Sequence, residues 1–268
     1  MNNKKQARCL VYDLEISPRL GWAYDMWETN ILKIERPSHI MSLSWHWLGE
    51  KKRGKYVIHN IIQTDSMPRF LKDSTDDYDI VKKLHKLLEE AHIVIAHNAS
   101  RFDNKVSNTM FLKHNMTPPS PFKTVDTLTV ARSKFKFPRN SLGELGEFLG
   151  CGCKSEETHK ELWYDCIMNN NKKAWEKMKI YNDRDVELLI KIYYKLLPYM
   201  TTHPNLSVIS QNPDGCPRCG ANASNLNYRG YRYTTTGTYR RLRCMECGGW
   251  CAERVQEKDF LKPEFVNI

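Results

Sequence analysis

The sequence has no long apolar run, no internal repeat and no low-complexity tract. No stretch approaches the roughly 18 consecutive apolar residues that a membrane-spanning helix needs. The polar, basic first residues lead directly into a strand-like segment, without the apolar stretch and small-residue cleavage site of a secretory signal. We therefore expect a cytoplasmic protein that has no membrane partner.

The composition is that of an ordinary globular chain, with 41% hydrophobic and 27% charged residues among 268. This length suits one sizeable domain and a small appendage. Periodicity is lost in the Pro-, Thr-, Ser- and Asn-rich stretch 198–213, which is typical of a linker. We expect a first domain with its linker over residues 1–205 and a second domain over residues 206–268.

The net charge and the cysteine content also bear on what the chain binds. The formal net charge of +10 favours a polyanion such as nucleic acid, because lysine and arginine bound to phosphates release condensed counterions. The nine cysteines of a cytoplasmic chain are expected to be metal ligands or free thiols rather than disulfides.

The first domain opens with a strand-like segment, residues 7–16. Leu10, Tyr12 and Leu14 alternate with polar or smaller residues, so a strand places Asp13 and Glu15 side by side on its other face. The remaining periodic segments predict an α/β domain with a mixed sheet flanked by helices. They are a hairpin over 39–47 and 55–62, a helix over 77–91 that feeds a strand at 92–98, a helix from 101, a short helix opened by the capping box Ser141–Glu144, and a long helix over 172–197.

Four carboxylates, those of Asp13, Glu15, Asp103 and Asp185, are expected to meet at one edge of this sheet. Asp103 lies in the first turn of its helix, and Asp185 lies four residues after Tyr181 on one face of the long helix. Crowded carboxylates repel one another without a cation, and Mg²⁺ or Mn²⁺ prefers oxygen ligands. Two such ions about 3.5–4 Å apart can stabilise the charge that develops in phosphodiester hydrolysis. If the carboxylates converge, the pattern therefore predicts a divalent metal, Mg²⁺ or Mn²⁺, as their counter-charge.

Three segments carry a resemblance. VYDLEIS, AHNASRFDNKV and YNDRDVELL resemble the motifs D-x-E, N-x3-F-D and Y-x3-D of the DEDD exonuclease superfamily, in the same order. Tyr181 makes the chain similar to the tyrosine subclass, which includes the proofreading domains of family B DNA polymerases. Residues 125–150 resemble the connecting region of stand-alone, phage-type relatives, and the whole resemblance covers residues 7–197.

This resemblance implies a ribonuclease H-like fold, two divalent metals and 3′-to-5′ exonuclease activity. The four carboxylates would be the metal ligands, and Tyr181 would orient or help to deprotonate the attacking water. If a phage encodes the chain, the compartment is the host cytoplasm.

Several residues near these motifs keep two interpretations. Asn98 either contacts the scissile nucleotide or holds Asp103, or it only caps a turn. Phe102 either stacks on a base or packs in the core, and core packing is favoured. For Asp126, the favoured interpretation is a strand-end residue without a functional role. The alternative is that its carboxylate supports the metal ligands. Asp183 competes with Asp185 for the last metal position, and the Y-x3-D spacing favours Asp185.

The second domain contains two C-x2-C pairs, Cys216 with Cys219 and Cys244 with Cys247. Two-residue spacing lets both thiolates of a pair bind one ion, and four thiolates complete the tetrahedral shell of Zn²⁺. The pattern resembles a zinc ribbon with one structural Zn²⁺, whose closed shell leaves no position for a catalytic water.

The stretch between the two cysteine pairs, residues 226–243, is rich in arginine and tyrosine and has no acidic residue. Such a hairpin can hold phosphates and unstacked bases, although exposed arginines for solubility and packed tyrosines are the alternative. The candidate nucleic-acid contacts are Asn98, Phe102, Arg229, Arg232, Arg240 and Arg241.

Together these features predict a two-metal 3′-to-5′ exonuclease that acts on single-stranded or 3′-ended DNA in phage or bacterial DNA replication, recombination or degradation. The chain length leaves no room for a polymerase domain. The alternatives are an exoribonuclease, a structure-specific nuclease, a catalytically inactive nucleic-acid-binding module, and a structural protein of a replication or recombination complex.

Overall fold

The computed structural model describes residues 7–25, 27, 30–152, 159–234 and 237–255. Its contacts divide the chain into two compact units, one formed by Arg8–Ile192 and one by Tyr193–Ile268 with Met1–Ala7. Within the described ranges, no helix is long and apolar enough to cross a membrane. Each unit is described by itself below.

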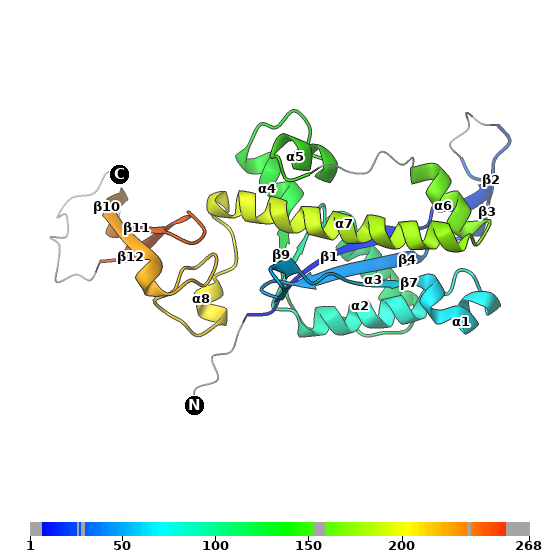
Figure 1. The fold of residues 1–268 in the computed structure, drawn as a ribbon, viewed down its shortest axis with the longest axis horizontal. Coiled ribbons are helices and arrows are strands. Elements are labelled where there is room, and N and C mark those ends of the chain that lie inside the picture. The colour runs from blue at the N-terminus through cyan, green and yellow to red at the C-terminus, as the bar shows by residue number, and fades with distance from the viewer. Residues whose placement is uncertain (1–6, 26, 28–29, 153–158, 235–236, 256–268) are drawn as a thin grey trace. The chain divides into compact units, whose positions relative to one another are not determined.

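The first unit is built on a mixed five-stranded sheet in the order β7-β4-β1-β8-β9 (Figure 1). The central strand β1 pairs antiparallel with β4, which pairs antiparallel with β7, whereas β8 and β9 continue on the other side of β1 as parallel strands. The mixed sheet is thus confirmed. The strand bounds are Cys9–Ile16 (β1), Ile40–Trp47 (β4), His59–Ile62 (β7), Ile93–Ala96 (β8) and Lys123–Asp126 (β9).

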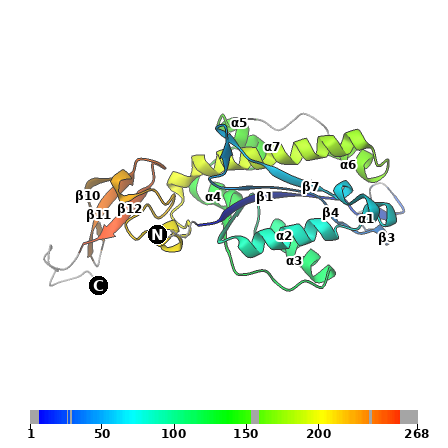
Figure 2. The ribbon, with the colours of Figure 1, turned by 60° about the horizontal axis from the view of Figure 1, so that its bottom comes forward.

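Helices cover both faces of this sheet. Figure 2 shows α2 and α3 below the sheet and α6 and α7 above it. Gly146 of α5 packs closely on α7, because a Cβ atom at this glycine would lie 2.7 Å from the side chain of Leu188. The helix bounds are Met67–Lys72 (α1), Tyr78–Glu90 (α2), Asp103–Lys113 (α3), Thr127–Lys134 (α4), Leu142–Phe148 (α5), His159–Ile167 (α6) and Lys172–Leu196 (α7), with a 3-10 turn at Gln63–Ser66 (η1).

Alternation along β1 separates the core from the polar face. Leu10, Tyr12 and Leu14 pack against the apolar side chains of α2 and α3 in the main buried cluster. Asp13 lies on the opposite face, where it contacts α7. The period-two and period-3.6 patterns of the sequence therefore predicted which sides of β1 and α2 are buried.

Some local elements differ from the sequence expectations. A small antiparallel sheet of β2 (Leu20–Trp22) and β3 (Lys33–Arg36) follows β1 and was not predicted. The expected strand over 55–62 is interrupted, because β6 (Lys55–Tyr56) pairs with β5 (Lys51–Lys52) instead of continuing into β7. Helix α5 begins after Ser141 as expected, but the hydroxyl of Ser141 donates to Glu144 Oε2 at 2.7 Å instead of capping the backbone.

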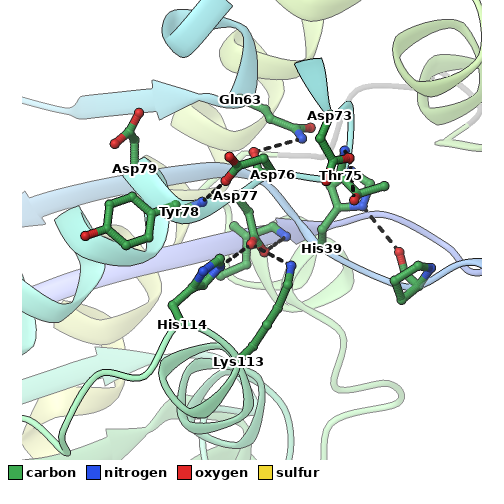
Figure 3. Close-up of polar contacts among 12 residues, drawn as sticks. His39, Gln63, Asp73, Thr75, Asp76, Asp77, Tyr78, Asp79, Lys113 and His114 are labelled. Atoms are coloured by element: carbon green, nitrogen blue, oxygen red, sulfur yellow. Dashed lines mark hydrogen bonds and ion pairs between the residues drawn. The ribbon is translucent and has the colours of Figure 1, made fainter. Parts of the chain in front are cut away.

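An ionic cluster around the buried carboxylate of Asp77 holds α2 and α3 to the sheet (Figure 3). Asp77, just before α2, accepts hydrogen bonds from the backbone amide of Ile40 at 2.9 Å, from Lys113 Nζ at 2.9 Å and from His114 Nε2 at 2.7 Å. Burial alone would raise the pKa of Asp77, but these hydrogen bonds outweigh it and hold the pKa below its usual value. The carboxylate of Asp77 is therefore ionised, and its hydrogen bonds connect β4, α2 and α3.

The second unit is a small three-stranded antiparallel sheet in the order β10-β11-β12. The strands span Leu226–Thr234, Gly237–Cys244 and Trp250–Arg254, and the short elements η2 (Leu197–Tyr199), α8 (Leu206–Ile209) and η3 (Ala223–Asn225) precede them. Gly220 and Gly248 each follow a cysteine pair with positive φ, at 74° and 72°. These left-handed turns close the two knuckles expected of a zinc ribbon.

Candidate metal centres and nucleic-acid interface

The four cysteines of the second unit form one cluster, and their sulfur atoms all lie within 4.8 Å of one another. The Sγ atoms of Cys216 and Cys247 are 3.8 Å apart, and those of Cys219 and Cys244 are 3.6 Å apart. A tetrahedral shell with Zn–S bonds of about 2.3 Å sets its sulfur atoms about 3.8 Å apart. The donor set and its spacing therefore fit one structural Zn²⁺. Cys251 lies outside this cluster, and its thiol is directed to the carbonyl of Leu242.

The four arginines predicted to contact nucleic acid do not share one environment. Arg240 lies 3.6 Å from Glu253, whereas Arg241 donates from Nε and Nη2 to the backbone carbonyl of Arg229 at 2.9 and 2.7 Å. Arg232 is exposed and stands opposite Tyr239 in the register of β10 and β11. The predicted set is therefore distributed over different parts of the ribbon.

Three of the four predicted carboxylates of the first unit converge. Oxygen atoms of Asp13, Glu15 and Asp185 all lie within 4.8 Å of one another. Strand β1 supplies the first two from one face, as its alternation predicts, and α7 supplies the third. Because a group of carboxylate oxygens suits a hard divalent cation, the residues fit Mg²⁺ or Mn²⁺.

A hydrogen-bonded relay fixes one of these carboxylates. Asn182, which is fully buried, donates from Nδ2 to Asp13 Oδ2 at 2.8 Å and accepts from Ser42 Oγ at 2.8 Å. Ser42 in turn accepts from Asn60 Nδ2 at 3.3 Å, and the same amide contacts Ser44 Oγ. The relay runs from β7 through β4 and α7 to β1, and it orients Asp13.

Asp185, and not its competitor Asp183, lies in the carboxylate group. Asp183 instead accepts a hydrogen bond from Ser44 Oγ at 2.7 Å. The fourth predicted ligand, Asp103, is 3% exposed and is not a member of the group found among the described residues. Burial, aided by the charge of Asp126, raises the pKa of Asp103 to about 7.

Tyr181 is buried one turn before Asp185 on α7. Its ring packs edge-on against Trp163, with the ring centroids 5.8 Å apart, and Trp163 Nε1 donates to the backbone carbonyl of Ile16 at 3.1 Å. Trp163 therefore contacts both Tyr181 and β1, the strand that carries Asp13 and Glu15. This contact was not predictable from the sequence, because Trp163 belongs to a short helix outside the three motifs.

A largely apolar cavity of about 590 Å³ begins beside Glu15, at Ile16. Phe102 lines it and is 44% exposed, so the favoured interpretation of Phe102 as a core residue is wrong. The physical reason is that α3 begins at Asp103, which leaves Phe102 before the helix and outside its buried stripe. The other lining residues are Ser17, Pro18, Arg19, Leu20, Arg36, Ser38, Trp163, Tyr164, Ile167 and Met168.

Asn98 forms a turn after β8. Its φ of 69° is left-handed, and its carbonyl accepts hydrogen bonds from the amides of Arg101 and Phe102. Asp126 fixes this turn, since it accepts from the amides of Asn98 at 3.0 Å and Ser100 at 3.2 Å, and it also caps α4. Asp126 therefore has a structural role that the sequence did not favour.

A family model described as the RNase_H superfamily matches residues 48–197, more than half of the chain. The chain belongs to the RNase_H superfamily. The matched range includes Asp103, Tyr181 and Asp185 and begins after Asp13 and Glu15, which β1 adds to the same sheet. No curated protein matches this member of the superfamily.

Solved structures share the fold of this RNase_H superfamily chain. One is the family B DNA polymerase from the hyperthermophilic archaeon Pyrobaculum calidifontis, with a TM-score of 0.51 and 13% sequence identity. The alignment covers 86% of this chain and 31% of the polymerase, so the chain spans about a third of that protein's length. At this identity the likeness concerns the fold.

Proposed function

We propose that this protein is a 3′-to-5′ exonuclease that hydrolyses phosphodiester bonds with two Mg²⁺ (or Mn²⁺) ions. The observation that carries the proposal is the convergence of the carboxylates of Asp13, Glu15 and Asp185 within 4.8 Å on an RNase_H superfamily domain. Asp103 completes the proposed ligand set on the basis of its N-x3-F-D motif. The direction of cleavage rests on the resemblance to the DEDD tyrosine subclass.

When bound, the two cations stabilise the negative charge that hydrolysis develops on the attacking and leaving oxygens. The chain's own residues act around them. Asn182 holds the Asp13 carboxylate in one orientation through its 2.8 Å hydrogen bond. Tyr181 orients or helps to deprotonate the attacking water, and the apolar cavity that contains Phe102 receives the terminal nucleoside.

The proposed substrate is single-stranded or 3′-ended DNA, and the proposed setting is phage or bacterial DNA replication, recombination or degradation. A site of four zinc-bound thiolates needs reduced cysteines, which supports a reducing compartment such as the cytoplasm. The zinc ribbon serves to hold the substrate strand.

The direct test supplies single-stranded DNA, duplex DNA and RNA, each labelled at the 5′ end, together with Mg²⁺. A ladder of products shortened from the 3′ end of DNA supports the proposal. RNA shortened in preference to DNA identifies an exoribonuclease, and cleavage confined to branched or flapped substrates identifies a structure-specific nuclease.

Two aspartates of α7 provide a matched comparison. Asp185→Ala removes a proposed ligand, whereas Asp183→Ala removes a neighbouring carboxylate that bonds to Ser44. We expect Asp185→Ala and Asp13→Ala to abolish cleavage while Asp183→Ala retains it, provided that melting curves show all variants folded. Cleavage that survives in Asp13→Ala and Asp185→Ala contradicts the proposal. DNA binding without any cleavage by the wild-type protein identifies an inactive binding module.

A further inference from the structure

The three strands of the ribbon have two chemically different faces. Cross-strand partners in an antiparallel sheet lie on the same face, and neighbours along a strand lie on opposite faces. Arg232 pairs with Tyr239, Arg243 pairs with Trp250, and Arg241 lies between Tyr239 and Arg243 on the same side of β11. We call these five residues, Arg232, Tyr239, Arg241, Arg243 and Trp250, the basic face.

In the part of the ribbon that the structure describes, the opposite face has no comparable group of arginines: it carries the exposed Tyr228 and Tyr233, and part of it packs within its own unit. Arg240 stands opposite Glu253 and forms an ion pair with it at 3.6 Å. Leu242 and Cys251 line a cavity of about 450 Å³ together with residues of the segment 205–217. Among the described residues of the three strands, Glu253 is the one acidic residue, and its register places it away from the basic face.

The guanidinium of Arg241 is held in place on the basic face. Its Nε and Nη2 atoms donate to the carbonyl of Arg229, and its central carbon lies 5.3 Å from the ring centroid of Trp250. A bulge between Tyr228 and Tyr231 interrupts the strand pairing at Arg229, and Gly230 within the bulge has a φ of 81° that favours glycine. Arg241 is exposed, so its remaining N–H groups can bind a phosphate at little cost in side-chain entropy.

The backbone of Trp250 is also held, by a hydrogen bond from an arginine. Arg218, which is 9% exposed, donates from Nη1 to the carbonyl of Trp250 at 2.6 Å and from Nε to that of Met200 at 2.7 Å. Gly249 leaves the space for this contact, because a Cβ atom there would clash with Nη1 of Arg218. The backbone carbonyl of Trp250 is therefore held in place, while the residue as a whole is 45% exposed.

We propose that the basic face binds a single strand of nucleic acid, with Arg232, Arg241 and Arg243 on successive phosphates and with bases stacked on Trp250 and Tyr239. The assignment deepens the proposed nuclease function and rests on it for the nature of the partner. The described strand residues of this face include arginines and no acidic residue, which matches the phosphates, and stacking on an aromatic ring tolerates any base. Arg240 stands opposite Glu253 on the other face of the sheet, so the proposal places it outside this surface.

The test measures binding of a fluorescein-labelled 20-nucleotide oligo(dT) to the full zinc-loaded chain by anisotropy, at several salt concentrations and without added Mg²⁺. Each lost phosphate contact on a single strand makes the slope of log K against log salt less negative by about 0.7, so Arg241→Ala with Arg243→Ala should change it by about 1.4. Trp250→Ala should weaken binding about 5- to 150-fold, the value of one stacked base, and Trp250→Phe should restore part of it.

The matched control is Arg240→Ala, which removes the same charge from the same strand on the opposite face. We expect it to leave both affinity and salt slope unchanged. Equal weakening by Arg240→Ala and Arg241→Ala overturns the proposal, because it indicates diffuse attraction to net charge. Unchanged binding in Trp250→Ala also overturns it. So does a blunt duplex that binds more tightly than oligo(dT) and loses affinity when the basic face is mutated. Oligo(U) in place of oligo(dT) separates RNA from DNA as the bound strand.

Two controls keep this test apart from that of the nuclease. Zinc content and melting temperature of each variant show that the ribbon has folded. Asp13→Ala should abolish strand shortening, and the effects of Arg241→Ala and Trp250→Ala on binding should persist in that background. If cleavage is absent but binding depends on the basic face, the proposed function fails alone; if cleavage occurs without dependence on the basic face, the present inference fails alone.

Discussion

Asn182 donates a hydrogen bond from its amide nitrogen to Asp13 Oδ2 at 2.8 Å, across 169 positions of the sequence. The amide oxygen of Asn182 accepts from Ser42 Oγ, so neither end of this fully buried side chain is left to rotate. Because Asn182 is held by hydrogen bonds at both ends of its amide, its N–H donor favours one orientation of the Asp13 carboxylate. A residue that orients a metal-binding carboxylate contributes to metal affinity without touching the metal.

Asn182→Ala should therefore lower Mg²⁺ affinity and exonuclease activity by about 10- to 100-fold, the usual effect of removing a group that supports a metal ligand. The measurement is cleavage rate against Mg²⁺ concentration. A residue that only stabilises the fold would lower the melting temperature without moving the Mg²⁺ midpoint. Asn60→Ala, which removes a more distant member of the relay, is the control and should move the midpoint less.

The pairing of Asp13 with Glu15 was predictable because strand alternation is local: both residues lie on one strand and follow from period two. The buried stripe of α2 was predictable for the same reason, with a period of 3.6. The role of Asn182 was not predictable, because it depends on how α7 lies over β1 and β4. Hydrogen bonds between distant elements leave no periodic trace in the sequence.

Phe102 shows how a small error in a boundary changes a side chain's environment. The expected helix began at residue 101 and placed Phe102 in its buried stripe, but α3 begins at Asp103 and Phe102 has ψ of −79° just before it. Asp183 and Asp185 show the opposite case, since the motif spacing selected the aspartate that the structure brings to Asp13. The sequence therefore predicts the position of a residue within a regular helix better than that of a residue at a helix end, where the boundary is uncertain by one or two residues.

Asp77→Asn should destabilise the first unit by about 2 kcal/mol, because a neutral amide cannot replace the charge-assisted hydrogen bonds that the buried carboxylate accepts from Ile40, Lys113 and His114. The pKa of Asp77 is lowered from 3.8 in the folded protein. Its stabilising effect is therefore fully present above pH 3.8 and is lost as the pH falls through the lower folded value. Urea unfolding at pH 7 and at pH 3 measures both. A stability gap between wild type and variant that is no smaller at pH 3 contradicts the ionic interpretation.

Cys219→Ser should abolish zinc binding and unfold the ribbon, because closed zinc sites supply about 10 kcal/mol or more of apparent binding free energy to small domains. Cys251→Ser is the matched control, since this thiol contacts a backbone carbonyl outside the cluster. Metal analysis should give one zinc per chain for the wild type and for Cys251→Ser, and none for Cys219→Ser. Loss of zinc in Cys251→Ser would show that the ligand set is different.

Asp103→Asn should stabilise the metal-free protein in a manner that depends on pH. Burial raises the pKa of Asp103 from 3.8 to about 7, so ionising this carboxyl costs free energy in the folded state but not in the unfolded state. The wild type should lose stability relative to the variant as the pH rises from 3.8 to about 7, by on the order of 4 kcal/mol in total, with no further change above.

Melting temperatures of wild type and Asp103→Asn in a Mg²⁺-free buffer, from pH 4.5 to 8.5, measure this effect. A gap that widens up to about pH 7 and then levels is the expected result. If Asp103 is the fourth metal ligand, saturating Mg²⁺ should close the gap at pH 8, because a cation compensates the buried charge. A gap that Mg²⁺ leaves unchanged means that Asp103 does not face the metal, and that the three clustered carboxylates act without it.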